Sequence, residues 1–143
     1  MDSEVQRLEH LKLVQAVIER MARNSFALKS WAVLLVSASL ALGADRADYQ
    51  FFMVGMLPVL MLWLLDGYYL WQERLYRALY NGVRRGAHGQ HDADPYSLTT
   101  TAYRETEQTW TRICFSVTVG WFYGVLGLVV TVATGVTLVA QLS

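Results

Sequence analysis

The chain has 143 residues, which is enough for one modest domain. Apolar residues make up 54% of it and charged residues only 17%, whereas an average soluble domain carries about 25% charged residues. Lysine plus arginine and aspartate plus glutamate both total 12, so no excess of positive charge indicates a nucleic-acid partner. The single cysteine excludes an intramolecular disulfide framework and a zinc site built on several cysteines. This composition is typical of an integral membrane protein, and we interpret residues 1–143 as a single all-α membrane domain.

Residues 4–24 have the spacing of an amphipathic helix. Apolar side chains recur every three or four positions along one face: Leu8, Leu11, Val14, Ile18 and Met21. Two interpretations stay open, a cytosolic helix packed on the other cytosolic helices and a helix lying on the membrane surface. Asn24 and Ser25 are suited to cap a second helix that follows.

Three apolar stretches are long enough to cross a bilayer. A helix needs about 20 mostly apolar residues to span roughly 30 Å of hydrocarbon. Residues 51–70 and 113–140 meet this length, and 26–43 meets it with Lys29 snorkelling to the interface. The sequence therefore predicts three transmembrane helices with these bounds. A cleavable signal peptide is the less favoured interpretation of the first stretch, because four acidic residues precede it.

Basic residues are unevenly distributed over the segments that flank these helices. Of the 12 lysines and arginines, 11 lie in the N-terminal part or between the second and third stretches, and only Arg46 lies in the turn 44–50. Cytosolic segments of membrane proteins carry the excess of basic residues. We therefore expect a multi-pass protein of a bacterial inner membrane, with a cytosolic N-terminus and a C-terminus outside.

The second apolar helix is expected to continue into the cytosol over 71–85, where apolar residues keep a helical spacing. Residues 86–101 are rich in glycine, aspartate, serine and threonine and contain Pro95, which predicts a flexible loop. A further cytosolic helix is expected over 102–112, leading directly into the third transmembrane helix. The cytosolic part is thus predicted to be an N-terminal helix beside two helical extensions.

Four side chains of that loop are of types that ligate divalent metals: His88, His91, Asp92 and Asp94. A structural metal site usually needs four ligands held in fixed positions, and glycines flank His88 on both sides. A solvated loop is therefore the favoured interpretation, with no metal and no cofactor. The sequence also contains no glycine-rich phosphate loop and no hydrolase or metalloprotease motif, so we do not expect an enzyme.

Asp66 lies inside the second apolar stretch, one turn from its cytosolic end. A carboxylate at this depth is costly unless a partner neutralises it. Lys29 enters the first transmembrane helix at the same depth, so we predict an intramembrane ion pair between these two residues. The favoured role is a clamp between helices. A proton or ion pathway is the minor alternative, because one acidic residue does not make a relay.

Small residues recur along the third apolar stretch: Ser116, Gly120, Gly124, Gly127, Thr131 and Gly135. Rows of small residues allow two helices to approach closely in a membrane. We predict a helix-packing face here, and we expect a homo-oligomer because three helices bury little surface by themselves. Whether the partner helix belongs to another copy or to the same chain stays open.

Two strings carry a resemblance to known proteins: RMARNSFALKSW, around residues 21–31, and LLDGYYLWQERLYRALY, residues 64–80. Over roughly residues 5–85 the chain resembles small uncharacterised bacterial inner-membrane proteins. Proteins of that kind occur as accessory membrane components beside antiphage systems, including RADAR-like and RNA-guided ones. The resemblance implies a role associated with defence, and it implies no catalytic or binding residue.

We expect a non-enzymatic protein whose partners are the lipid bilayer, other copies of itself and a cytosolic protein, without nucleic acid. The favoured hypothesis is an oligomeric effector that perturbs the membrane, or an accessory component of a bacterial defence system. The alternative is a membrane anchor or scaffold that recruits a cytosolic complex. A proton- or ion-coupled transporter is the second alternative, and it would need more intramembrane charge and internal repeats than the sequence contains.

Overall fold

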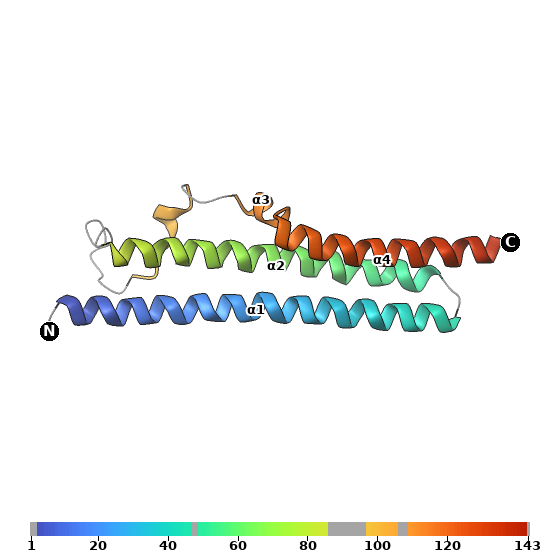
Figure 1. The fold of residues 1–143 in the computed structure, drawn as a ribbon, viewed down its shortest axis with the longest axis horizontal. Helices are drawn as coiled ribbons and strands as arrows, with labels where there is room; N and C mark the ends of the chain where they lie inside the picture. The colour runs from blue at the N-terminus through green and yellow to red at the C-terminus, as the bar shows by residue number, and fades with distance from the viewer. Residues whose placement is uncertain (1–2, 47–48, 86–96, 106–108, 143) are drawn as a thin grey trace.

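The computed structural model describes residues 3–46, 49–85, 97–105 and 109–142, and every regular element in these ranges is a helix. In chain order the elements are α1 (Ser3–Arg46), α2 (Tyr49–Arg84), the 3-10 helix η1 (Thr101–Tyr103), α3 (Trp110–Cys114) and α4 (Val117–Leu142). α1 and α2 lie side by side and antiparallel, and α4 runs along α2 in the direction of α1 (Figure 1). The two ends of the chain therefore lie at opposite ends of an elongated molecule.

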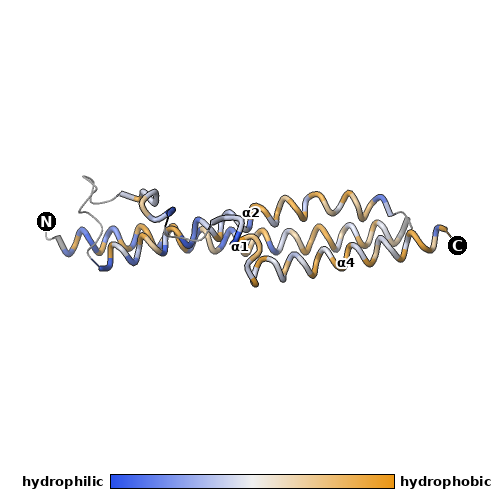
Figure 2. The backbone as a smooth tube through the Cα atoms, turned by 90° about the horizontal axis from the view of Figure 1, so that it is seen from above, coloured by the Kyte–Doolittle hydropathy of each residue, from blue (hydrophilic) through white to orange (hydrophobic). Residues whose placement is uncertain are grey.

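Hydropathy divides this molecule into two halves along its length (Figure 2). The polar half consists of residues 3–24 of α1, residues 71–84 of α2 and η1. The apolar half consists of residues 25–46, residues 49–70 and α4. α1, α2 and α4 are each long and apolar enough to cross a membrane. The predicted all-α class and the presence of three such helices are thus confirmed.

α1 is one uninterrupted helix of 44 residues, about 66 Å long. The sequence predicted two helices here, 4–24 and 26–43, with Asn24 and Ser25 as a cap between them, and that break is wrong. No proline or glycine interrupts residues 4–42. The Ser25 hydroxyl is also engaged elsewhere, because it donates a hydrogen bond to Asp66 of α2. α2 likewise runs as one helix through both 51–70 and 71–85, up to Arg84.

The helix predicted over 102–112 is also wrong. The structure has irregular backbone over 97–100, then η1, then the five-residue helix α3, and α4 begins only at Val117. α3 ends at Cys114, and the backbone of the next residue, Phe115, has φ −95° and ψ 13°. Threonines cluster in this part of the chain, and β-branched residues lose side-chain freedom in a helix. The chain therefore enters α4 through an elbow instead of a straight extension.

Each half has its own buried cluster. In the apolar half, side chains of α1, α2 and α4 meet: Ala32, Val36, Phe52, Val59, Val119, Tyr123 and Val130. In the polar half, Val14 of α1 packs against Leu79 and Val83 of α2. Val14 belongs to the predicted apolar stripe, whereas Leu8 of the same stripe is 56% exposed. Helix pairing thus continues beyond the apolar half.

Candidate functional site

The most concentrated polar chemistry in the described part of the chain lies where the two halves meet. Asp66 on α2 is completely buried, and its Oδ2 lies 2.5 Å from Nζ of Lys29 on α1. Lys29 Nζ also donates to Ser25 Oγ at 2.9 Å, and the Ser25 hydroxyl donates to Asp66 Oδ1. Ser25 and Lys29 are one helical turn apart, so they reach the carboxylate together. Both carboxylate oxygens are therefore satisfied from α1.

α3 and α4 reach the same level. Tyr123 of α4 is buried, its hydroxyl donates to the Leu62 carbonyl at 3.4 Å, and it is close enough to Asp66 to interact with the carboxylate. Cys114 of α3 is 2% exposed, with its Sγ against Gly67. Four helices thus converge around one neutralised charge pair. We call Ser25, Lys29, Asp66 and Tyr123 the boundary cluster.

The boundary cluster is suited to hold helices together. A buried carboxylate with a cation and a hydroxyl on its two oxygens has its desolvation cost largely offset, and removing one partner leaves a charge uncompensated. Lys29 keeps 19% of its side chain exposed, so its ammonium group lies at the edge of the cluster. The pairing of Lys29 with Asp66 follows from their depth, whereas the sequence analysis assigned Ser25 to a helix cap and Tyr123 to no site.

The predicted small-residue face lies along a groove between α2 and α4. Gly120, Gly124 and Gly127 line a pocket of about 270 Å³, and Thr131 and Gly135 line a second of about 480 Å³. The two pockets share Met56 and Leu60 of α2, so they form one groove, which we call the α2–α4 groove.

No described helix of the same chain approaches this row closely. A methyl group added at Gly124 or Gly135 would meet no atom within 4 Å. One added at Gly127 would meet only the tip of Met56, at 3.8 Å. Ser116, the first residue of the row, precedes α4, and its buried hydroxyl has no hydrogen-bond partner among the residues that the structure describes. Gly120 lies next to the backbone of Phe115 in the elbow. From Gly124 to Gly135 the row is therefore open within one chain and not a packed interface.

Close approach occurs instead at glycines of α2. Gly55 lies directly against Ser39 of α1, and Gly67 lies directly against Cys114, so an added methyl group at either position would collide with its neighbour. Glycine inside a helix costs about 1 kcal/mol relative to alanine. A glycine within a predicted helix therefore indicates a position where a neighbouring segment comes close. Near Gly67, Trp63 Nε1 donates to the Cys114 carbonyl at 3.0 Å, and its ring meets Phe115 edge-on. These contacts hold the elbow against α2.

One face of the polar half is covered by residues 97–103, which the structure describes. The Nε2 atom of His10, a residue only 2% exposed, lies 3.0 Å from the Ser97 carbonyl oxygen. Tyr103 of η1 lies against Gly82 of α2. These contacts bring residues 97–103 back onto the α1–α2 pair. No pattern in the sequence indicates that His10 is buried.

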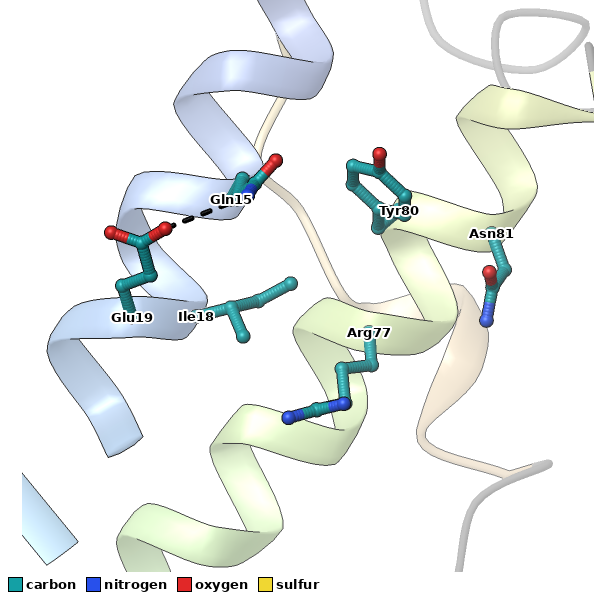
Figure 3. Close-up of a pocket in the computed structure, with 6 residues that line it drawn as sticks. All are labelled: Gln15, Ile18, Glu19, Arg77, Tyr80 and Asn81. Carbon is teal, nitrogen blue, oxygen red and sulfur yellow. Dashed lines mark hydrogen bonds between the residues drawn. The ribbon is translucent and has the colours of Figure 1, made fainter. Parts of the chain in front are cut away.

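A second surface of the polar half is an open groove between α1 and α2 of about 430 Å³ (Figure 3). Most of the residues that line it have polar or charged side chains, although their aliphatic and aromatic parts also face the groove: Gln15, Ile18, Glu19, Arg77, Tyr80 and Asn81. Gln15 donates to Glu19 Oε1 at 3.5 Å along α1. Arg77 forms an ion pair with Glu73 of its own helix at 2.6 Å. We call this the polar groove.

The predicted metal candidates His88, His91, Asp92 and Asp94 lie outside the described residues. Among the residues that the structure does describe, no group of three or more histidine, cysteine, aspartate or glutamate side chains is placed to hold a metal ion.

Comparison of the chain with protein-family models, with curated proteins and with solved structures finds no match. The function is therefore inferred from the fold and the contacts of the chain itself.

Proposed function

We propose that the chain is a membrane anchor that holds a two-helix projection in the cytosol and recruits a partner through it. The observation that carries this proposal is the continuity of α1 and α2 from the apolar half into the polar half. Residues 3–24 extend about 33 Å beyond the apolar half. Residues 71–84 of α2 accompany them for about 21 Å. A protein that only had to be retained in the bilayer would not need a helix pair of this length outside it.

Exposed aromatic side chains support a membrane boundary at the level where the two halves meet. Phe26 and Trp31 of α1 are 73% and 58% exposed, and Phe115 and Trp121 near the start of α4 are 74% and 76% exposed. Aromatic rings, tryptophan above all, concentrate at the membrane–water interface. Together with the basic residues of the polar half, they favour insertion of the apolar half with the polar half in the cytosol.

Site-specific photocrosslinking in the host cell tests the proposal. A photoreactive residue at an exposed position of the polar half, such as Arg7 or Arg84, should give a discrete adduct with another protein. The same group at Leu57 or Leu128, both exposed in the apolar half, is the matched control and should give no such adduct. Absence of a protein adduct at every exposed position of the polar half would overturn the anchor function.

A second candidate function is an oligomeric effector that perturbs the membrane, in a bacterial defence context. The open α2–α4 groove favours it, because only Val119, Tyr123 and Val130 of α4 are buried against the described part of the chain. An α4 with so little internal packing is available for contacts with other copies. Ion leakage from vesicles or cells on expression of the chain, with and without its neighbouring genes, tests this candidate. Intact membranes under every condition would exclude it.

A further inference from the structure

The polar groove carries opposite charges on its two walls. Glu19 belongs to the α1 wall, and Arg77 extends from the α2 wall toward α1 (Figure 3). Both residues line the same pocket, so they lie at the same height along the helices. In this chain their contacts run along their own helices, to Gln15 and to Glu73 respectively.

Arg77 is oriented to donate hydrogen bonds to a further carboxylate. Glu73, which is 9% exposed, takes the Nε–H of Arg77 at 2.8 Å and pairs with Nη2 at 2.6 Å. A guanidinium has five N–H donors in a fixed fork, so donors remain after these two contacts. The side chain of Arg77 is 63% exposed. Glu73 thus holds a cation whose outer edge faces the groove.

We propose that the polar groove is the interface between two copies of this chain, related by a two-fold axis parallel to the helices. The proposal rests on the membrane anchoring proposed above, which gives both copies the same orientation and the same height. A rotation of 180° then places α1 of one copy opposite α2 of the other. Glu19 of each copy faces Arg77 of its partner, so the charge complementarity is satisfied twice.

The assembly formed in this way is an antiparallel four-helix bundle, a common arrangement of helices. In a two-fold interface every contact between two different residues occurs twice, and the opposite charges on the two walls of the groove suit such a repeated contact. Ile18 and Tyr80 are half-buried at the groove and supply apolar surface between the two charge pairs. The opposite face is less suited to this pairing, because residues 97–103 already cover part of the α1–α2 pair.

Charge reversal tests the pairing. Glu19→Arg and Arg77→Glu should each reduce the dimer population about tenfold, because each replaces two attractive contacts with two like-charge contacts. The measurement is co-purification of two differently tagged copies from membranes. The matched control is Arg20→Glu, a reversal at an exposed position of α1 that does not line the groove, which should leave the dimer unchanged.

Mixing the two variants is the decisive measurement. One copy with Glu19→Arg and one copy with Arg77→Glu have complementary charges at both contacts, so their mixed dimer should return to the wild-type level. A contact within one chain would not be rescued by mixing. A thermal melt of each variant shows whether loss of the Glu73 contact has unfolded the Arg77→Glu chain. In that case, cysteines at Gln15 of one copy and Asn81 of the other, with Cys114→Ala in both, should crosslink.

Several outcomes would overturn the proposal. The mixed dimer could stay at the level of the single variants, or the dimer could survive both reversals and be lost only on Gly124→Leu, which would place the interface in the α2–α4 groove. A photoreactive group at Gln15 that captures a different protein would assign the groove to that protein. A chain found outside the membrane fraction contradicts the anchor function itself, whereas a membrane-bound chain that stays monomeric contradicts only the pairing.

Discussion

At the scale of single residues, the two charged members of the boundary cluster, Asp66 and Lys29, differ in their access to water. Asp66 has no exposed surface, whereas the long side chain of Lys29 ends at the edge of the cluster with 19% of its side chain exposed. A lysine near the interface can move its ammonium group toward water, and a buried aspartate has no such route. Loss of either partner therefore has a different cost for the residue that remains.

We expect Lys29→Met to destabilise the protein more than Asp66→Ala does. Removing one member of a buried pair costs about 3–5 kcal/mol, and Asp66→Ala should fall at or below the lower end because Lys29 can reach water. The double variant should recover part of the loss of Lys29→Met. Thermal unfolding in detergent measures all three free energies, with Lys12→Met at an exposed position as the control. Two silent single variants, or strictly additive losses, would contradict the coupling.

Gly67 should not tolerate a side chain. An added methyl group would collide with Cys114 Sγ, and overpacking of this kind costs about 1–3 kcal/mol. Gly67→Ala should therefore lower the melting temperature, and Cys114→Ala in the same chain should restore most of it, since the sulfur is then gone. Gly124→Ala is the matched control, because it adds the same group to open space on α4. A neutral Gly67→Ala would show that the elbow is not held against α2.

The ion pair of the boundary cluster can be predicted from the sequence, whereas the positions of Tyr123 and His10 cannot, for physical reasons that the structure shows. Lys29 and Asp66 are the ionisable residues expected at one depth of two antiparallel helices, so depth alone brings them together. Tyr123 reaches the same level only because the chain turns at Phe115, and that elbow is set by packing of Trp63 on α3. His10 is buried by a segment 87 residues away in the sequence, and no local pattern indicates such a contact.

At the scale of the elements, the helices are predicted better than their joints. Apolar spacing identifies much of the buried side of residues 4–24 and of 71–85, with Leu8 exposed and His10 buried as exceptions, but it does not decide whether a helix continues. Ser25 would be a good N-cap in isolation, with its oxygen accepting a hydrogen bond from a backbone N–H group. In the structure its hydroxyl instead donates to the carboxylate of Asp66, and a hydrogen bond to a charged group is stronger than one between neutral groups. Over 102–112 the error is the opposite one, because a straight helix was predicted where the structure has none. Threonine-rich segments have weak helix propensity of their own.

Because the α2–α4 groove is open, a leucine should affect stability differently at Gly124, which lines the groove, and at Gly55, which is packed against α1. Gly55→Leu should destabilise the single chain, because Ser39 lies directly against Gly55. Gly124→Leu should leave the melting temperature of the monomer unchanged, because the groove provides the space. Differential scanning fluorimetry in detergent measures both. A stability loss at Gly124 would mean that the groove closes in the folded chain.

The oligomer population of Gly124→Leu tests separately whether copies of the chain assemble through α4. A fall in oligomer at constant monomer stability would support assembly through α4. An unchanged population would assign the small-residue row to lipid.

At the scale of the whole molecule, the basic residues and the polar half lie together, and this sets the expected orientation. We predict that a reporter active only in the cytosol gives a signal when fused before Met1 and no signal when fused after Ser143. Three crossings would place the two ends on opposite sides of the membrane, and the two ends lie at opposite ends of the molecule (Figure 1). Equal signals from both fusions would exclude an odd number of crossings.

The boundary cluster also lies close to the midpoint of α1. Ser25 is about 33 Å from the start of the helix and about 32 Å from its end. α1 packs on α2 on both sides of this point, at Val14 in the polar half and at Val36 in the apolar half. The charged cluster is thus a polar layer between two apolar layers of the same helix pair. A sideways load on the cytosolic arm of α1 is therefore shared between the cluster and the apolar contacts on either side of it.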